Sequence, residues 1–247
     1  MQPVDYEQIA ESYDRRYATN DFAATEHALR DFLGATHSIV ELGCGTGHWL
    51  QVVDTLPQHP FVVGLDRAWA MLTRVCAGAP RAALVRGSAE LLPLNDAVFE
   101  RVFCINALHH FPDPPSVFRE CARVTCSGGA FMTIGLDPHT GKDRWWIYDF
   151  FPGALAADRS RYPSAVSVRA HLAAAGFERI ETVVAQRLPA RIAFDEAEAK
   201  GILDRHSTSQ LLVIDDAEWE AGSARLRRER PALYADLRLY ATTGWKN

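Results

Sequence analysis

The stretch Val40–Gly47, V-E-L-G-C-G-T-G, contains the strongest indication of the fold. It follows a short apolar run typical of a buried strand and precedes a helix-like segment, so we predict a strand, a glycine turn and a helix. Gly43, Gly45 and Gly47 let the backbone turn sharply and approach a ligand closely. Free N–H groups at the start of the helix suit a carboxylate or a phosphate. A glycine turn with purely structural duties is the alternative.

The glycine spacing argues against two common nucleotide-binding loops. A dinucleotide-binding turn has the pattern G-x-G-x-x-G, whereas here the third glycine comes one residue early and His48 stands where that pattern has glycine. A phosphate-binding P-loop ends in Gly-Lys-Ser/Thr, and no lysine is near. A nicotinamide-dependent oxidoreductase is therefore a disfavoured alternative.

Around this turn, β-rich runs alternate with helix-like segments. Such a rhythm predicts an α/β fold with a parallel sheet and helices on both faces. Two later runs complete a predicted seven-stranded sheet. The predicted strands lie at 38–42, 61–65, 82–86, 101–105, 130–136, 177–185 and 236–243, and predicted helices at 47–56, 67–78 and 114–125.

Other segments flank or interrupt this alternation. We expect two N-terminal helices at 5–18 and 22–33, and two insertions on one domain that spans residues 1–247. The second insertion is predicted to hold two helices, the later one starting at the capping box formed by Asp215 and Glu218. The domain is divided into cofactor-capping helices (1–34), a cofactor-binding core (35–136) and two insertions on the acceptor side (137–163 and 187–232).

The composition excludes several classes of function. The chain has 247 residues, a net charge of −5 and no long basic run, which argues against a nucleic-acid partner. No apolar run approaches the ~20 residues that a membrane helix needs. The polar N-terminus lacks the apolar core of a secretory signal, so we expect a cytoplasmic protein. The five cysteines include no C-x-x-C pair, which argues against a disulfide framework or a zinc site.

The run from Glu41 to Gly47 resembles the first motif of the Rossmann-like (class I) S-adenosylmethionine-dependent methyltransferases, small-molecule branch. Later segments agree with the same family in order and spacing: the second strand ends at an acidic residue, Asp66, and the third leads into G-S-A-E-x-x-P-L from Gly87. The segment F-R-E-C-A-R-V-T-C-S-G-G-A-F from Phe118 resembles the family's helix and turn before the fifth strand. The resemblance covers residues 5–136 closely and implies S-adenosylmethionine as cofactor.

The resemblance also implies a set of cofactor-binding residues. In the family, the acidic residue after the second strand holds the ribose diol, although Asp66 is equally suited to cap the next helix. Ser88 departs from the family, which usually has an aspartate there to accept from the adenine amino group. The implied residues are Tyr13, Glu41, Gly43, Cys44, Gly45, Gly47, Asp66, Arg67, Ser88, Ala89, Glu90 and Asn106.

The segment after the fourth strand, Ile105–Phe111, bears on the acceptor. In the family's small-molecule branch this segment lines the cavity near the methionine part of the cofactor. Enzymes that methylate DNA bases or protein glutamine carry Asp/Asn-Pro-Pro-Tyr directly after this strand. Here Asp113-Pro114-Pro115-Ser116 comes seven residues late and is interpreted as a helix start. We therefore expect a small-molecule acceptor.

Methyl transfer from a sulfonium is an in-line displacement, so the protein mainly aligns the reactants and excludes water. A base is needed only where the nucleophile loses a proton early, and His109 is the best placed histidine for that role. A lone histidine is more often structural, and the acceptor atom (O, N or C) stays open. A catalytically silent S-adenosylmethionine-binding regulator would carry the same cofactor motifs.

The first insertion is rich in aromatic residues. Such density suits an apolar or aromatic small molecule, so Trp145, Trp146 and Tyr148 are candidate residues of an acceptor pocket. The alternative is that these aromatics fill a satellite core or the interface of a homodimer.

Overall fold

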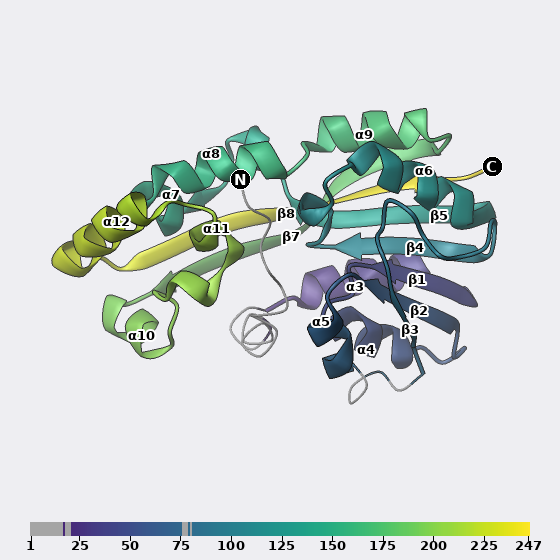
Figure 1. The fold of residues 1–247 in the computed structure, drawn as a ribbon, viewed down its shortest axis with the longest axis horizontal. Helices are drawn as coiled ribbons and strands as arrows, with labels where there is room; N and C mark the ends of the chain where they lie inside the picture. The colour runs from purple at the N-terminus through teal and green to yellow at the C-terminus, as the bar shows by residue number, and fades with distance from the viewer. Residues whose placement is uncertain (1–16, 18–20, 76–78, 80) are drawn as a thin grey trace.

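The computed structural model describes residues 17, 21–75, 79 and 81–247, which form one eight-stranded sheet with helices around it (Figure 1). The sheet order is β3-β2-β1-β4-β5-β8-β6, and β7 pairs with β8. The strands are β1 (Ser38–Leu42), β2 (Phe61–Asp66), β3 (Ala83–Arg86), β4 (Phe99–Ile105), β5 (Thr125–Leu136), β6 (Arg144–Trp145), β7 (Glu178–Ile192) and β8 (Leu233–Trp245).

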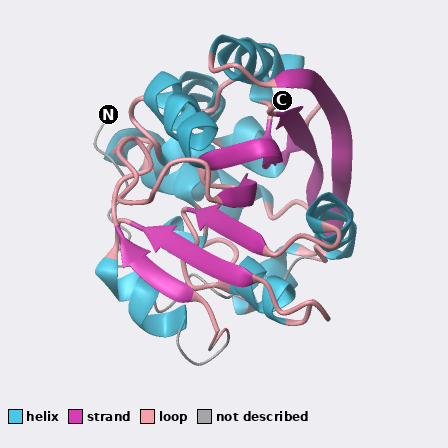
Figure 2. Cartoon of the chain, turned by 90° about the vertical axis from the view of Figure 1, so that its right-hand side faces the viewer, coloured by secondary structure: helices cyan, strands magenta, loops and turns pink. Residues whose placement is uncertain are grey.

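Helices cover both faces of this sheet, as Figure 2 shows. Three short 3-10 turns lie at Leu108–His110, Pro138–Thr140 and Arg205–Ser207. The helices are α3 (Ala23–Leu33), α4 (His48–Asp54), α5 (Trp69–Val75), α6 (Pro114–Val124), α7 (Trp146–Phe150), α8 (Pro152–Arg161), α9 (Ala165–Ala174), α10 (Phe194–Ala199), α11 (Ser209–Leu212) and α12 (Asp216–Glu229).

The first five strands form the parallel half of the sheet. Val40 of β1 lies in register between Val63 of β2 and Val102 of β4, and all three side chains are buried. Most residues of β1, β2 and the second half of β4 are buried because helices cover both of their faces. One core packs α3, α4 and α5 against the sheet, and a second packs α6 and α9 against the opposite face.

The antiparallel half is built around β8. One edge of β8 pairs with β5 over Leu239–Trp245 and then with the short β6, while β7 pairs along the other edge as far as Leu233. The pair β7–β8 therefore continues past the end of β5 as a two-stranded ribbon.

This ribbon carries a helical lobe made of α7, α8, α10, α11 and α12, at the left of Figure 1. The lobe has its own apolar core, in which Trp146, Phe151, Phe194 and Leu226 are buried. A separate core allows these helices to be stable without contributing to the sheet's two cores.

The predicted α/β fold is confirmed, and all seven predicted strands are present, the last antiparallel. The predicted helix starts at Asp113 and Asp215 are confirmed too, since each side chain accepts a hydrogen bond from a backbone N–H in the first helical turn. The helix predicted over 5–18, with Tyr13, lies outside the described residues except for Tyr17.

Two details of the prediction were wrong. Residues 187–192 belong to β7 rather than to a helical insertion, and the remainder of that insertion forms α10, α11 and α12 instead of two helices. Residues 187–192 are mostly exposed and include Pro189, so this part of β7 lacks the alternation that marks a strand. The two-residue β6 was not predicted.

No helix within the described ranges combines the length and the apolar character needed to span a bilayer.

Candidate cofactor and acceptor site

The loop after β1 has the shape that its glycines predict. Gly43, Gly45 and Gly47 all have positive φ angles, of 70°, 53° and 85°, a region that other residues adopt only with strain. The N–H groups of Gly43 and Cys44 both donate to the carbonyl of Leu65, at 2.8 and 3.0 Å. The loop is thereby fastened to the end of β2.

Two of these glycines are required by the fold itself. A Cβ at Gly43 would lie 2.6 Å from Cβ of Ala107, and one at Gly47 would lie 2.7 Å from Cγ1 of Val75. The missing side chains thus let the loop pack against the segment after β4 and against α5. Gly43 and Gly47 therefore have a structural role in the turn, whether or not a ligand also binds there.

Glu41, the last but one residue of β1, is a buried carboxyl group. Its side chain is 1% exposed, and Oε2 has no hydrogen-bond partner among the described residues. Burial, and secondarily the nearby Asp66 carboxylate, raise the pKa of Glu41 well above its usual value. A buried carboxyl oxygen without a donor is well suited to a ligand that brings one.

Asp66, at the end of β2, holds the glycine loop in place. Its Oδ2 accepts from the N–H of Gly45 at 2.8 Å, and its Oδ1 accepts from the N–H of Ala68 at 2.9 Å. Burial raises its pKa, although these backbone hydrogen bonds oppose the rise. A carboxylate has about four lone-pair positions, and the backbone N–H of Arg67 uses a third, so one remains for a ligand. The neighbouring Arg67 is exposed.

The segment after β3 places a second acidic group near this edge of the sheet. The Ser88 hydroxyl donates to Oε2 of Glu90, which leaves the lone pairs of the serine oxygen to accept. Oε1 of Glu90 is buried and has no partner in the described part of the chain, and Ala89 between them is buried.

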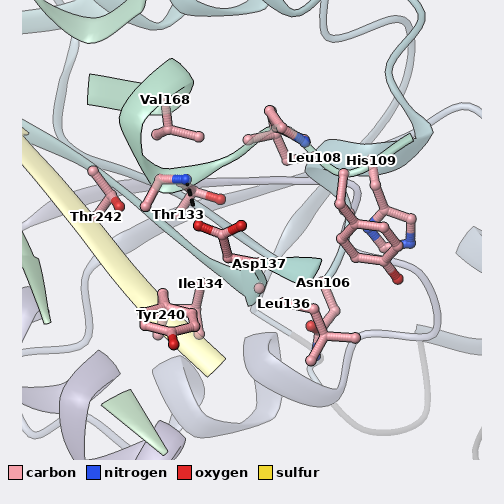
Figure 3. A pocket seen from close by; sticks show the side chains of 15 residues that line it. Asn106, Leu108, His109, Thr133, Ile134, Leu136, Asp137, Val168, Tyr240 and Thr242 are labelled. Carbon is pink, nitrogen blue, oxygen red and sulfur yellow. Dashed lines mark hydrogen bonds between the residues drawn. The ribbon is translucent and has the colours of Figure 1, made fainter. Parts of the chain in front are cut away.

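A cavity opens at the ends of β4 and β5, between the sheet and α9 (Figure 3). Asn106, directly after β4, has a φ of 52° and donates its N–H to the carbonyl of Ile134 at 2.8 Å. This turn brings the segment 106–109 onto the cavity wall. The His109 ring stacks on Tyr162, with ring centres 3.8 Å apart and planes 16° apart, so Tyr162 fixes the plane of the histidine.

Asp137 at the end of β5 shapes the same cavity. Its Oδ1 accepts from the N–H of His139 at 3.0 Å, and its Oδ2 accepts from the N–H of Ala165 at 2.8 Å, the hydrogen bond drawn in Figure 3. The second of these bonds ties the end of β5 to the start of α9. Asp137 therefore holds the cavity walls together.

Residues 40–133 match a family described as a methyltransferase domain. This part of the chain is therefore similar to a methyltransferase domain. An uncharacterised methyltransferase of Bacillus subtilis is 31% identical over 140 residues, 53% of this chain and 51% of that protein. A malonyl-[acyl-carrier protein] O-methyltransferase of Halorhodospira halophila is 36% identical over 105 residues, which cover 41% of this chain and 36% of that protein.

A third relative is a phthiotriol/phenolphthiotriol dimycocerosates methyltransferase of Mycobacterium leprae, 30% identical over 167 residues, 66% of this chain and 60% of that protein. The chain thus spans 36% to 60% of the lengths of these curated relatives. The crystal structure of the Bacillus subtilis protein has the same fold, with a TM-score of 0.64 at 20% identity, covering 92% of this chain and 99% of that one.

S-adenosylmethionine is the cofactor of this methyltransferase class, and the residues at the carboxyl edge of the sheet fit it. The cofactor offers hydrogen-bond donors at its ammonium group, its ribose hydroxyls and its adenine amino group. Within the described ranges, Glu41 and Glu90 each have a buried carboxyl oxygen without a donor, and Asp66 keeps a spare lone pair. The hydrogen-bond donors of the cofactor could therefore pair with these carboxyl acceptors of the protein.

The aromatic residues proposed for an acceptor pocket lie elsewhere. Trp146 is 5% exposed within the core of the helical lobe, Trp145 and Tyr148 pack against that core, and the Tyr148 hydroxyl donates to Asp158 at 2.8 Å. None of the three lines the cavity beside β4 and β5. Their placement matches the satellite-core alternative.

The cavity instead uses residues that the motifs did not single out. Tyr162 follows α8, while Tyr240 and Thr242 lie on β8 and reach the cavity through the pairing of β8 with β5. The alternation of β8 shows that Tyr240 and Thr242 share a face. Nothing in the sequence indicates which strand that face lies beside.

Proposed function

We propose that the protein transfers a methyl group from S-adenosylmethionine to an oxygen, nitrogen or carbon nucleophile of a small molecule held in the cavity beside β4 and β5. One observation supports this most directly. Ala107 both packs against Gly43 of the cofactor loop and lines the cavity, so the cofactor site and the cavity share a wall. Ligands of open α/β sheets bind at the carboxyl ends of the strands, where both sites lie.

In this proposal the acidic groups at the strand ends hold the cofactor. Asp66 accepts from the ribose hydroxyls, Glu41 from the ammonium group, and the pair Ser88 and Glu90 from the adenine amino group. When bound, S-adenosylmethionine supplies a methyl group on a positively charged sulfur that leaves as a neutral thioether. Because the leaving group is already activated, the main task of the protein is to align the acceptor and exclude water.

His109 is the candidate base within the cavity. The stack with Tyr162 fixes the ring plane, and His110 lies beside it with ring centres 3.8 Å apart. Where the acceptor is a hydroxyl or an amine, His109 takes its proton as the methyl group arrives. Such a base typically contributes about 10²–10⁴-fold in rate.

The proposal is tested in two stages. Calorimetry first compares binding of S-adenosylhomocysteine with binding of NAD; tight NAD binding without S-adenosylhomocysteine binding would refute the proposal in favour of an oxidoreductase. Labelled S-adenosylmethionine and a small-molecule extract of the source organism then reveal the acceptor. Binding without any methylated product indicates a silent regulator instead.

With the acceptor known, His109→Asn is expected to lower kcat about 100-fold or more for a protonated nucleophile. Its affinity for S-adenosylhomocysteine should not change. His206→Asn is the control, because His206 is exposed in the helical lobe, beside Asp204. Equal kcat values for wild type and His109→Asn would remove His109 from the mechanism.

A further inference from the structure

The floor of the cavity consists of two cross-strand pairs of β5 and β8. Gly135 pairs with Tyr240, and Thr133 pairs with Thr242. All four residues line the cavity, and Figure 3 shows Thr133 on one strand with Tyr240 and Thr242 on the other. Leu239, which alternates with them on β8, faces the opposite core. The floor is thus a patch of one sheet face left uncovered by apolar packing.

Gly135 leaves space that the fold does not use. A Cβ placed on Gly135 would meet no atom of the described chain within 4 Å, and its φ is not in the left-handed region. Neither a turn nor a close packing contact therefore requires glycine here. Glycine in the interior of a strand weakens the strand and often marks the close approach of a ligand.

Tyr240, directly across from Gly135, brings a polar group for which the described part of the chain supplies no partner. Its hydroxyl is buried and has no hydrogen-bond partner among the described residues. Two other hydroxyls of the cavity wall are satisfied: Thr242 Oγ1 lies 3.0 Å from Thr182 Oγ1, and Tyr162 accepts from Gln210 Nε2 at 3.0 Å. Buried tyrosine hydroxyls usually have a hydrogen-bond partner, so the Tyr240 hydroxyl is suited to a partner supplied by a bound ligand.

We propose that Gly135 and Tyr240 form the seat of the methyl acceptor, an inference that rests on the proposed function. The body of the acceptor lies over Gly135, and one of its oxygen or nitrogen atoms forms a hydrogen bond with the Tyr240 hydroxyl. Leu108 and Val168 supply apolar contacts to that body. The acceptor class is a small molecule that combines an apolar body with a hydroxyl, carbonyl or amine. An analogue without the polar atom leaves the buried hydroxyl unsatisfied and is rejected.

Phenol and toluene test this seat without knowledge of the natural acceptor, because they differ by one hydroxyl group. Both are titrated by ligand-observed NMR into the full chain saturated with S-adenosylhomocysteine. Wild type is expected to bind phenol about tenfold more tightly than toluene, which corresponds to one hydrogen bond. Tyr240→Phe should remove this preference, and Gly135→Ala should weaken both probes by placing a methyl group in the cavity.

Thermal unfolding provides a second readout that needs no acceptor. Tyr240→Phe removes an unsatisfied buried hydroxyl, and Gly135→Ala lowers the conformational entropy of the unfolded chain. Each variant should therefore leave Tm unchanged or raise it by about 2–4 °C. Tyr234→Phe is the control, because Tyr234 is also on β8 but lies outside the cavity and donates to Asp149. This control should keep the preference for phenol.

A fall in Tm of several degrees in Tyr240→Phe would overturn the proposal, since the hydroxyl would then have a partner within the fold. A preference for phenol that survives in Tyr240→Phe would overturn it equally. If S-adenosylhomocysteine does not bind to wild type at all, the proposed function fails instead, and that result is measured before either probe is added.

Discussion

Glu41→Gln tests whether the buried carboxyl group of β1 serves the fold or the cofactor. Glu41 is 1% exposed, and its Oε2 has no partner among the described residues. Because burial raises its pKa in the folded state, the folded protein holds a proton that the unfolded chain has released above pH 4.5. The stability of wild type therefore falls as pH rises from about 4.5 towards the raised pKa.

Glutamine keeps the shape of the side chain but cannot ionise. The free energy of unfolding of Glu41→Gln should therefore exceed that of wild type by about 1.4 kcal/mol for each pH unit within this window. For a chain of this size that corresponds to roughly 3–6 °C in Tm per pH unit. At pH 4 the two proteins should be equally stable, and at pH 8 the variant should be clearly more stable.

Cofactor binding should change in the opposite direction. Loss of a charge-assisted hydrogen bond costs about 1.5–3 kcal/mol, so Glu41→Gln should bind S-adenosylhomocysteine about 10–100-fold more weakly at pH 8. The affinity of wild type should rise as the pH approaches the raised pKa of Glu41 and the carboxyl ionises, and that of the variant should not. Urea unfolding and calorimetry at pH 5, 6.5 and 8 measure both quantities. Glu181→Gln, an exposed carboxyl on β7, is the control. A less stable variant with the affinity of wild type would refute the reasoning.

Three further predictions concern the same edge of the sheet and the first insertion. Asp66→Ala should weaken S-adenosylhomocysteine binding by about one to two decades, measured by calorimetry, because it removes the proposed ribose acceptor and releases Gly45. Gly47→Ala should lower Tm even without ligand, since its Cβ would lie 2.7 Å from Val75 at a φ of 85°. Burial raises the pKa of Asp143 to about 6, so stability falls as pH rises from about 3.8 to 6. Asp143→Asn should remove that fall in a pH series of urea unfolding curves, and an unchanged pH profile would contradict the assignment.

The alternation of strands and helices could be predicted because it depends on local patterns. The parallel strands contain short apolar runs, and side chains such as Asp113 and Asp215 mark helix starts through their own hydrogen bonds. The residues proposed to bind the cofactor could be located for the same reason, since Glu41 and Asp66 lie at the ends of predicted strands and Glu90 lies shortly after one. The roles of Glu41 to Asp66 in binding stay predictions.

The acceptor side could not be predicted, because it depends on which strands become neighbours. Tyr240 enters the cavity only because β8 pairs with β5, some hundred residues earlier in the chain. The aromatic run at 145–151 indicated burial correctly, but not whether the residues bury one another or a ligand. In the structure Trp146 and Phe151 pack into the lobe core. Composition alone does not distinguish these outcomes.

The position of β8 also has a consequence for biosynthesis. β8 lies between β5 and β7, both of which precede it in the chain, so neither can complete its pairing before residues 233–245 leave the ribosome. Until then, β5 presents an open apolar edge in the nascent chain, a site for mispairing with other chains. Cavity, ribbon and lobe core therefore form late and together, after the parallel half has had time to fold. Slow translation upstream of residue 233 would prolong the interval in which a chaperone must shield that edge.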